Sequence, residues 1–288
     1  MRSKSTSLNQ FRYTVHLAAF TFSLSLLAGR AHCGPVGGKG IHRTKASMPS
    51  GTSSGLDYAD TPASSTAAVS MATAIAKARY TLVGRYYSNP ANNWKILTST
   101  EGKALSAKGL LVFVVYENAG AYSDTHTYSN GYSYGQQAYL YAYGTIHQPT
   151  NRPIYFAIDE QDGYALSEEN TKFPNNIDFL VGVHDGMNDA QVSKGSGAPT
   201  YPIGVYAGGD FCAYALGASY GQPGNMKPLV TYTWLCASSS YPGFQQFLAS
   251  NKWSLWQYTI TEATNLKINN VGIDQDYGRG DTGAFLVP

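Results

Sequence analysis

The chain has 288 residues, of which 13% are charged and 13% are aromatic, and its formal net charge is +2. The first 33 residues hold four of the 20 Lys and Arg residues and none of the 18 Asp and Glu residues, so the remainder carries a net charge of −2. We therefore expect no basic surface and no nucleic-acid partner. The 23 tyrosines supply stacking faces and hydroxyl groups together, as is common in secreted proteins that handle carbohydrate.

The amino-terminal segment has the features of a secretory signal peptide over residues 1–33. Basic residues precede an apolar stretch at 17–28, and Ala31 and Cys33 stand three and one residues before a cleavage point. The stretch is too short to cross a membrane. The alternative is a lipoprotein acylated at Cys33. We expect a secreted mature protein that does not insert into a membrane once the signal is removed.

Residues 34–54 are mostly Gly, Ser, Thr, Lys and Pro, which predicts a disordered leader because such a segment cannot bury a core. Residues 55–288 are expected to form a single domain. After removal of the signal, Cys212 and Cys236 remain in an oxidising compartment, where we expect a disulfide. The alternative is two free buried thiols. Neither cysteine has another Cys or a His at ligand spacing, and we expect no metal site and no cofactor.

Strand-like apolar runs alternate with helix-like stretches along the domain. This alternation predicts an α/β fold, namely a (β/α)8 TIM barrel, with a doubly wound open sheet as the alternative. The eight strands are expected at residues 55–59, 80–87, 110–117, 153–159, 201–207, 230–237, 254–259 and 271–276.

Several stretches between these strands carry helix signals. Thr61, followed by a proline, is typical of an N-cap, and Thr98 with Glu101 three residues later forms a capping-box pattern. Residues 131–144 predict another helix. His184 shares a helical face with apolar residues, so we expect it to pack rather than to bind a ligand.

The fourth expected strand ends in three acids, at Asp159, Glu160 and Asp162. Because side chains alternate along a strand, Ala157 and Asp159 should face the interior of the barrel while Phe156 packs against the helices. The carboxyl ends of strands are where α/β folds place their chemistry. Asp159 is therefore the first candidate for a functional carboxylate.

Other expected strands also end in carboxylates. Asp57 belongs to the first strand, Glu117 ends the third, and Asp274 and Asp276 share one face of the eighth. Hydrolysis of a glycosidic bond requires one acid that donates a proton and another that stays ionised, and crowded like charges raise at least one pKa. Arg85 is a candidate to hold one of these carboxylates in its ionised form.

Seven motifs in this order resemble the bacterial glycoside-hydrolase-like TIM-barrel domain of unknown function, a relative of the family 25 lysozymes. The motifs are Gly-Leu-Asp57-Tyr, Gly-Arg85-Tyr-Tyr, Tyr116-Glu117, Ile-Tyr-Phe-Ala-Ile-Asp159, Ile-Gly-Val-Tyr206-Ala-Gly, Trp256-Gln-Tyr258 and Gly-Ile-Asp274-Gln-Asp276. The resemblance implies a TIM barrel acting on a glycan of the cell-wall type. It places the acid of the first strand at Asp57, that of the fourth at Asp159, and that of the eighth at Asp274 or Asp276.

One position departs from the lysozyme pattern. In the lysozymes the fourth strand carries a second acid, the proton donor, two residues after the first, and here Gln161 occupies that position. An amide cannot act as a general acid. Glu117 could supply the proton, or an irregular turn at 160–162 could bring one of its acids inward. Otherwise the barrel binds sugar without cutting it.

We therefore expect a secreted glycoside hydrolase that acts on a polysaccharide, with peptidoglycan as one candidate. Asp159 and Glu117 would be the acid/base pair, and Asp57 and Asp274 would be supporting carboxylates. The alternative is a catalytically inactive glycan-binding barrel, in which Tyr86 joins the aromatic side chains that stack on sugar. The expected substrate-binding residues are Arg85, Tyr87, Tyr206, Trp256, Gln257, Tyr258 and Asp276.

Overall fold

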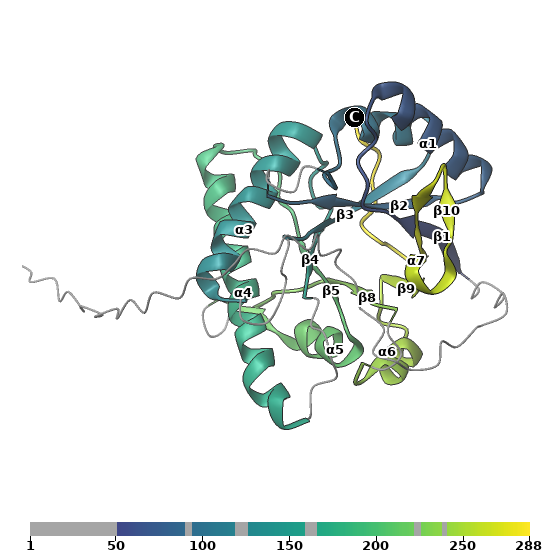
Figure 1. Cartoon of the computed structure of the whole chain (residues 1–288). Coiled ribbons are helices and arrows are strands. Elements are labelled where there is room, and N and C mark those ends of the chain that lie inside the picture. The colour runs from purple at the N-terminus through teal and green to yellow at the C-terminus, as the bar shows by residue number, and fades with distance from the viewer. Residues whose placement is uncertain (1–50, 90–93, 119–125, 159–165, 222–225, 238–240) are drawn as a thin grey trace, which may run out of the picture.

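A computed structural model describes residues 51–89, 94–118, 126–158, 166–221, 226–237 and 241–288. Within these ranges eight strands form a closed barrel surrounded by helices (Figure 1). The predicted signal peptide and nearly all of the predicted leader lie outside the described residues. No helix within them is both long enough and apolar enough to span a membrane.

The barrel confirms the predicted fold class and excludes the open sheet. Each expected segment overlaps one barrel strand, although the eighth segment, 271–276, holds only the first three residues of its strand. In the order around the barrel they are β1 (Thr52–Asp57), β12 (Asp274–Arg279), β9 (Leu255–Thr259), β8 (Tyr232–Leu235), β5 (Ile203–Ala207), β4 (Ile154–Ala157), β3 (Leu111–Tyr116) and β2 (Leu82–Tyr87). β1 begins three residues earlier than expected, because its pairing with β12 extends back to Thr52 and Arg279.

The direction of the last strand differs from that of a regular (β/α)8 barrel. β12 pairs antiparallel with both β1 and β9, whereas the other barrel pairs are parallel. The amino end of β12 therefore lies beside the carboxyl ends of the parallel strands, with Asp274 opposite Asp57 and Asp276 opposite Gly55. This reversal brings the two acids of β12 to the end of the barrel where α/β folds place their chemistry.

The helices form the outer layer, and two short hairpins lie outside the barrel. The helices are α1 (Ser65–Lys77), α2 (Ser99–Ser106), α3 (Tyr128–Tyr141) with its π-helical continuation η3 (Ala142–Ile146), α4 (Leu166–Ser193), α5 (Gly209–Gly217), α6 (Phe244–Ser250) and α7 (Thr261–Thr264). The hairpins pair β6 (Ser219–Tyr220) with β7 (Lys227–Pro228) and β10 (Lys267–Ile268) with β11 (Val271–Gly272).

Of the two helix N-caps predicted from the sequence, the structure confirms one and contradicts the other. Thr98 caps α2 as predicted, its hydroxyl accepting a hydrogen bond from the Glu101 backbone N–H at 3.1 Å. The cap predicted at Thr61 is wrong, because α1 is capped by Ser64. The Thr61 hydroxyl instead donates to the carbonyl oxygen of Ile96 at 2.8 Å, which ties the loop after β1 to the loop after β2.

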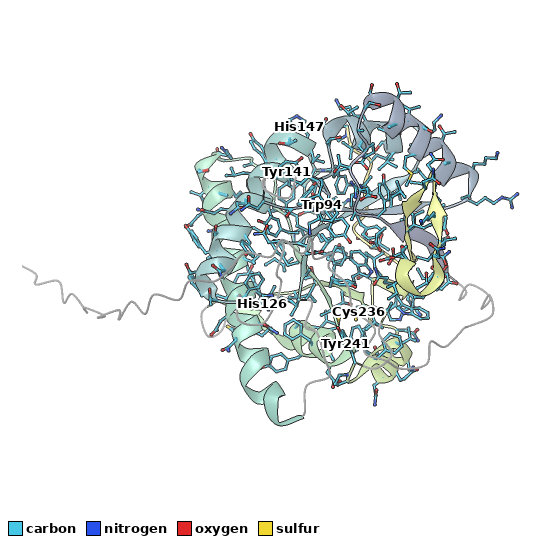
Figure 2. The ribbon with its side chains drawn as sticks, in the orientation of Figure 1. Trp94, His126, Tyr141, His147, Cys236 and Tyr241 are labelled. Atoms are coloured by element: carbon cyan, nitrogen blue, oxygen red, sulfur yellow. The ribbon has the colours of Figure 1, made fainter. Side chains whose placement is uncertain are left out.

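The two faces of the barrel strands pack in two different apolar layers, as the predicted alternation requires. Tyr155 and Ala157 belong to the cluster inside the barrel, whereas Ile154, Phe156 and Ile158 belong to the cluster under the helices. Figure 2 shows the side chains packed between and around the strands. The residue that follows Ile158 is Asp159, which lies outside the described residues.

α3 and α4 pack closely, side by side (Figure 1). Gly131 and Gly135 of α3 face the backbone of α4, and Gly182 and Gly186 of α4 face the backbone of α3. A Cβ atom on Gly135 would lie 2.2 Å from the carbonyl oxygen of Val183, closer than two atoms can approach. The absence of side chains at these four positions allows the two helices to approach each other.

The predicted disulfide is not formed. Cys212 and Cys236 are both buried free thiols. Cys212, on α5, packs in the layer under the helices and its thiol donates to the Ala207 carbonyl oxygen at 3.5 Å, whereas Cys236, labelled in Figure 2, belongs to the cluster inside the barrel. The two side chains therefore belong to different apolar clusters.

Candidate functional site

Three carboxyl groups gather where β1 and β12 meet. Asp57 is the last residue of β1, and Asp274 and Asp276 belong to the first three residues of β12. Two glycines make room for them. Gly55 lies opposite Asp276 in the ladder, and a Cβ atom on Gly84 of β2 would lie 2.6 Å from the Asp57 Cβ. The sequence thus places small residues beside the acids.

Gln257 connects two of these acids through one amide nitrogen. Its Nε2 donates to Asp57 Oδ2 at 3.0 Å and to Asp274 Oδ2 at 3.1 Å. Its Oε1 accepts a hydrogen bond of 2.8 Å from the Tyr206 hydroxyl, which fixes the orientation of the amide. The structure therefore brings together four residues predicted for the site, Asp57, Tyr206, Gln257 and Asp274.

The environment of Asp57 favours its protonated form. The side chain is buried, and burial followed by the charge of Asp274 raises its pKa to about 8. The hydrogen bonds from Gln257 and from the Tyr86 hydroxyl, the latter at 3.2 Å, oppose this shift without cancelling it. Asp57 is therefore a candidate for the acid that donates a proton.

Asp276 is the most deeply buried of the three acids, with no exposed surface. Its Oδ1 accepts a hydrogen bond of 2.9 Å from the Trp234 indole, and its Oδ2 receives none from the described N–H and O–H groups. Burial, followed by the charges of Asp57 and Asp274, raises its pKa well above the usual value. Its contact with the Asp57 carboxyl is a hydrogen bond only when one of the two acids is protonated.

Asp274 is partly exposed and accepts hydrogen bonds at both oxygens. Oδ1 accepts from the Thr261 backbone N–H at 2.6 Å and from the Thr261 hydroxyl at 2.9 Å, and Oδ2 accepts from Gln257. Three donors around one carboxyl group are the surroundings of an ionised carboxylate. Asp57 and Asp274 are thus neighbouring acids in different surroundings, the first buried and the second partly exposed and held by three donors.

Glu117 lies just beyond β3 in a buried ion pair. Lys95 Nζ lies 2.8 Å from Glu117 Oε1, and both side chains are almost fully buried. The ammonium also lies 5.3 Å from the centre of the Tyr86 ring. The Glu117 carboxylate is therefore already engaged with a buried ammonium, an arrangement that does not match the role of proton donor predicted for it.

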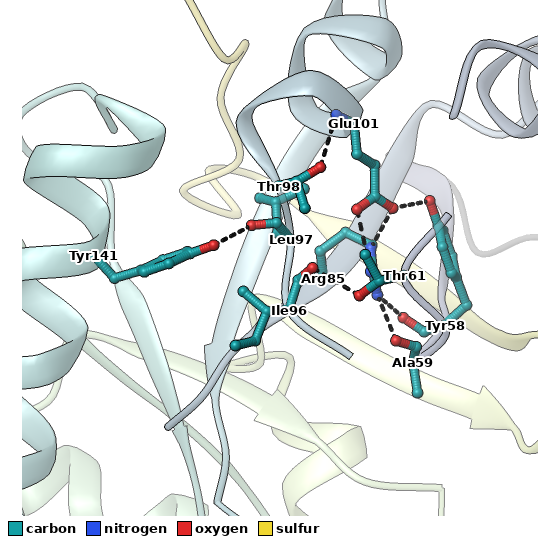
Figure 3. Close-up of polar contacts among 9 residues, drawn as sticks. All are labelled: Tyr58, Ala59, Thr61, Arg85, Ile96, Leu97, Thr98, Glu101 and Tyr141. Carbon is teal, nitrogen blue, oxygen red and sulfur yellow. Dashed lines mark hydrogen bonds and ion pairs between the residues drawn. The ribbon is translucent and has the colours of Figure 1, made fainter. Parts of the chain in front are cut away.

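Arg85 lies on the outer face of the barrel and does not reach the acids. Its Nε donates to Glu101 Oε1 at 2.7 Å, and its guanidinium also donates to the Tyr58 carbonyl oxygen (Figure 3). The Tyr58 hydroxyl donates to Glu101 Oε1 at 2.6 Å. Arg85 therefore supports the backbone that immediately follows Asp57.

Three further residues predicted to bind substrate also lie on the outer face of the barrel. The Tyr87 hydroxyl donates to Gln148 Oε1 at 2.9 Å, in the layer under the helices. Trp256 and Tyr258 pack against that same layer, and Tyr258 stacks on Tyr277 with ring centres 4.2 Å apart. Because Gln257 faces the interior, its two neighbours on β9 must face outward.

Asp159 and Gln161 fall outside the described residues, so their predicted roles remain predictions from the sequence. Sequence reasoning missed Lys95, Trp234 and Thr261. Alternation from Cys236 would have placed Trp234 inside the barrel, but Lys95 and Thr261 follow strands without any periodic signal. Within the described ranges, no three His, Cys, Asp or Glu side chains are arranged to hold a metal ion.

A closed eight-stranded barrel with carboxyl groups at the carboxyl ends of its parallel strands is the architecture of a glycoside-hydrolase-like barrel. The chain belongs to the family described as Rv2525c-like, glycoside hydrolase-like domain, whose model matches residues 73–278.

The structure is also similar to solved structures. The Tat-secreted protein Rv2525c of Mycobacterium tuberculosis, solved with L-tartrate, is 21% identical with a TM-score of 0.54, and the match covers 81% of this chain and 98% of that chain. A family 25 glycosyl hydrolase from Bacillus anthracis is 14% identical with a TM-score of 0.47, and the match covers 84% and 95% of the two chains. No curated protein compared with the chain matches it.

Proposed function

We propose that this protein is a glycoside hydrolase that acts on a polysaccharide of the cell-wall type. The observation that supports the proposal most strongly is the pair formed by Asp57 and Asp274, which share the Gln257 amide but differ in burial, the pKa of the buried Asp57 being raised. Two carboxyl groups whose surroundings drive their pKa values apart are what glycosidic bond hydrolysis requires.

In this mechanism Asp57 is the general acid. Its carboxyl proton passes to the glycosidic oxygen as the bond between that oxygen and the anomeric carbon breaks. The Asp274 carboxylate attacks the anomeric carbon as that bond breaks and forms a covalent glycosyl-enzyme ester. Water then adds to the anomeric carbon, the ester bond to Asp274 breaks, and the proton that the water loses restores the Asp57 carboxyl.

The proposal changes the roles assigned to Glu117 and Asp159. Glu117, paired with Lys95, supports the site as a fixed negative charge and not as the proton donor. Asp159 remains a second candidate for the ionised carboxylate, on the grounds of the sequence motif alone. Because Asp57 and Asp274 bind the same nitrogen, we expect a retaining reaction, since inverting pairs stand roughly 6.5 to 9.5 Å apart.

The second candidate function is glycan binding without hydrolysis. Asp57 is only 2% exposed, so a substrate has little access to its proton, and Gln161 occupies the position of the lysozyme proton donor. In this case the acids of the barrel end would orient sugar hydroxyls through hydrogen bonds. This function predicts retention of the protein on a glycan and no release of reducing ends.

The test is a release assay with peptidoglycan and a panel of soluble polysaccharides, scored for new reducing ends. Asp57→Asn and Asp274→Asn should each abolish release, and Asp178→Asn, which changes an exposed acid on α4, should leave it unchanged. Release that persists in Asp57→Asn would rule out the proposed acid. No release from any glycan, combined with retention on one of them, would establish the binding function instead.

We also propose that the protein is exported. The basic and apolar pattern of residues 1–33 supports export, and the similar protein from M. tuberculosis is described as Tat-secreted. Mass spectrometry of protein recovered outside the cell should find a chain that begins at Gly34. A lipid on Cys33 would support the lipoprotein alternative, and an uncut chain kept inside the cell would contradict both.

A further inference from the structure

We propose that Trp94 is a stacking platform for one sugar ring of the glycan, in a subsite beside the Asp57 and Asp274 carboxyl groups. The ligand is a pyranose ring with several C–H bonds on the face that contacts the indole. The proposal rests on the proposed glycan substrate, but it does not require that the glycan be cut.

The backbone fixes Trp94 at the end of the barrel that carries the acids. The Thr61 backbone N–H donates to the Trp94 carbonyl oxygen at 2.7 Å, and Thr61 follows Asp57 by four residues. Two residues beyond Trp94, Ile96 forms a parallel bridge with Tyr86, and the Leu97 N–H donates to the Tyr86 carbonyl oxygen at 2.9 Å. The segment that holds Trp94 therefore lies along the end of β2.

A buried cation links the Trp94 ring to the site. Lys95 Nζ lies 5.8 Å from the centre of the Trp94 ring and 5.3 Å from that of the Tyr86 ring, and the Tyr86 hydroxyl donates to Asp57. A cation close to an aromatic face attracts the ring. Glu117 holds this ammonium in place, so the Trp94 ring lies near a fixed cation.

Trp94 differs in exposure from the other three tryptophans. It is 36% exposed, whereas Trp234 and Trp253 are buried and Trp256 is half-buried against the layer under the helices (Trp94 is labelled in Figure 2). An exposed flat ring at the same end of the barrel as the carboxyl groups offers the apolar surface that a sugar ring contacts, while the carboxyl groups offer partners for its hydroxyls.

The experiment measures binding in the Asp57→Asn background, which would prevent cleavage by the proposed acid. Chitohexaose, and separately soluble peptidoglycan fragments, are titrated while tryptophan fluorescence and binding heat are followed. Trp94→Ala should weaken binding about tenfold, a difference of about 1.4 kcal/mol. Trp94→Phe should restore most of the affinity, because it keeps a stacking face. Tyr143→Ala removes an aromatic ring of similar exposure, 37%, and should have no effect.

The outcomes separate this proposal from the function on which it rests. Binding that Trp94→Ala weakens and Trp94→Phe restores would support the platform, whether or not the wild-type protein cuts the glycan. Equal binding by Trp94→Ala would overturn the platform and leave the proposed function intact. If the wild-type protein neither cuts nor binds any glycan, both proposals are wrong. Thermal melting of each variant checks that it is folded.

Discussion

Lys95 donates a hydrogen bond of 2.8 Å to Glu117 in surroundings from which water is almost excluded. Removing one member of such a buried pair leaves the other charge without a partner, and the cost greatly exceeds the net contribution of the intact pair. A substitution of one partner should therefore destabilise the protein by more than the intact pair stabilises it.

Lys95→Met should lower the free energy of unfolding by about 3–5 kcal/mol, because Glu117 would stay buried without its cation. The double variant Lys95→Met with Glu117→Gln should recover most of that loss, since no buried charge remains. Urea unfolding of the two variants and the wild type measures both effects. A single variant as stable as the wild type would show that Glu117 finds another partner or reaches water.

The pKa of Asp57 predicts how stability depends on pH. Its value is raised from about 4 in the unfolded chain to about 8 in the folded protein, so the folded state holds the proton more tightly between these limits. The contribution of Asp57 to the free energy of unfolding is therefore greatest below about pH 4. It falls as the pH rises toward 8, by up to about 1.4 kcal/mol per pH unit. The shift of Asp276 acts in the same direction.

Unfolding measured at several pH values between 5 and 8 tests this linkage. Asp57→Asn should show a smaller decrease in stability across that range than the wild type, because an amide does not titrate. Asp178→Asn, the change of an exposed acid, should keep the wild-type slope. Parallel slopes for the wild type and Asp57→Asn would contradict the raised pKa.

The close approach of α3 and α4 gives a prediction based on packing alone. Gly135→Ala places a methyl group 2.2 Å from the Val183 carbonyl oxygen, so the helices must separate, and the free energy of unfolding should fall by at least about 1–3 kcal/mol. Gly144→Ala, where nothing lies within 4 Å, should be neutral or stabilise by about 0.5–1 kcal/mol. Thermal or urea unfolding of the Gly135→Ala and Gly144→Ala variants measures both changes in stability.

The sequence predicted the barrel well because apolar runs and strand alternation are local signals. Those signals located the eight strands and set Ala157 inside and Phe156 outside. Applied consistently, the same alternation would have removed Arg85 and Trp256 from the site, because each is adjacent to a residue that faces inward. The motif match included them because the order of motifs along a sequence does not distinguish the two faces of a strand.

Other features had no local signal. The antiparallel direction of β12 depends on how the chain returns through the β10–β11 hairpin, and no residue pattern within β12 reports it. The partner of Glu117 is Lys95, which lies 22 residues earlier on a loop. No sequence pattern distinguishes this lysine from the others in the chain. The disulfide was expected from the oxidising compartment and the even number of cysteines left after cleavage, and neither specifies the layer in which each thiol lies.

The last prediction concerns the network behind Asp57. The Tyr58 hydroxyl donates to Glu101 Oε1 at 2.6 Å, and the Arg85 guanidinium lies 4.2 Å from the centre of the Tyr58 ring (Figure 3). Tyr58→Phe keeps the ring against Arg85 and removes only the hydrogen bond. Because that bond ends on a buried charged group, its loss should lower the free energy of unfolding by about 1.5–3 kcal/mol.

Tyr143→Phe, at a partly exposed tyrosine on η3, is the matched control and should change stability by less than about 0.5 kcal/mol. If Tyr58→Phe is equally harmless, the Arg85 guanidinium alone satisfies the Glu101 carboxylate. If the loss appears as expected, the backbone beside Asp57 is held by a network of three buried side chains. Glycan release by Tyr58→Phe would then show whether this network also positions the proposed acid.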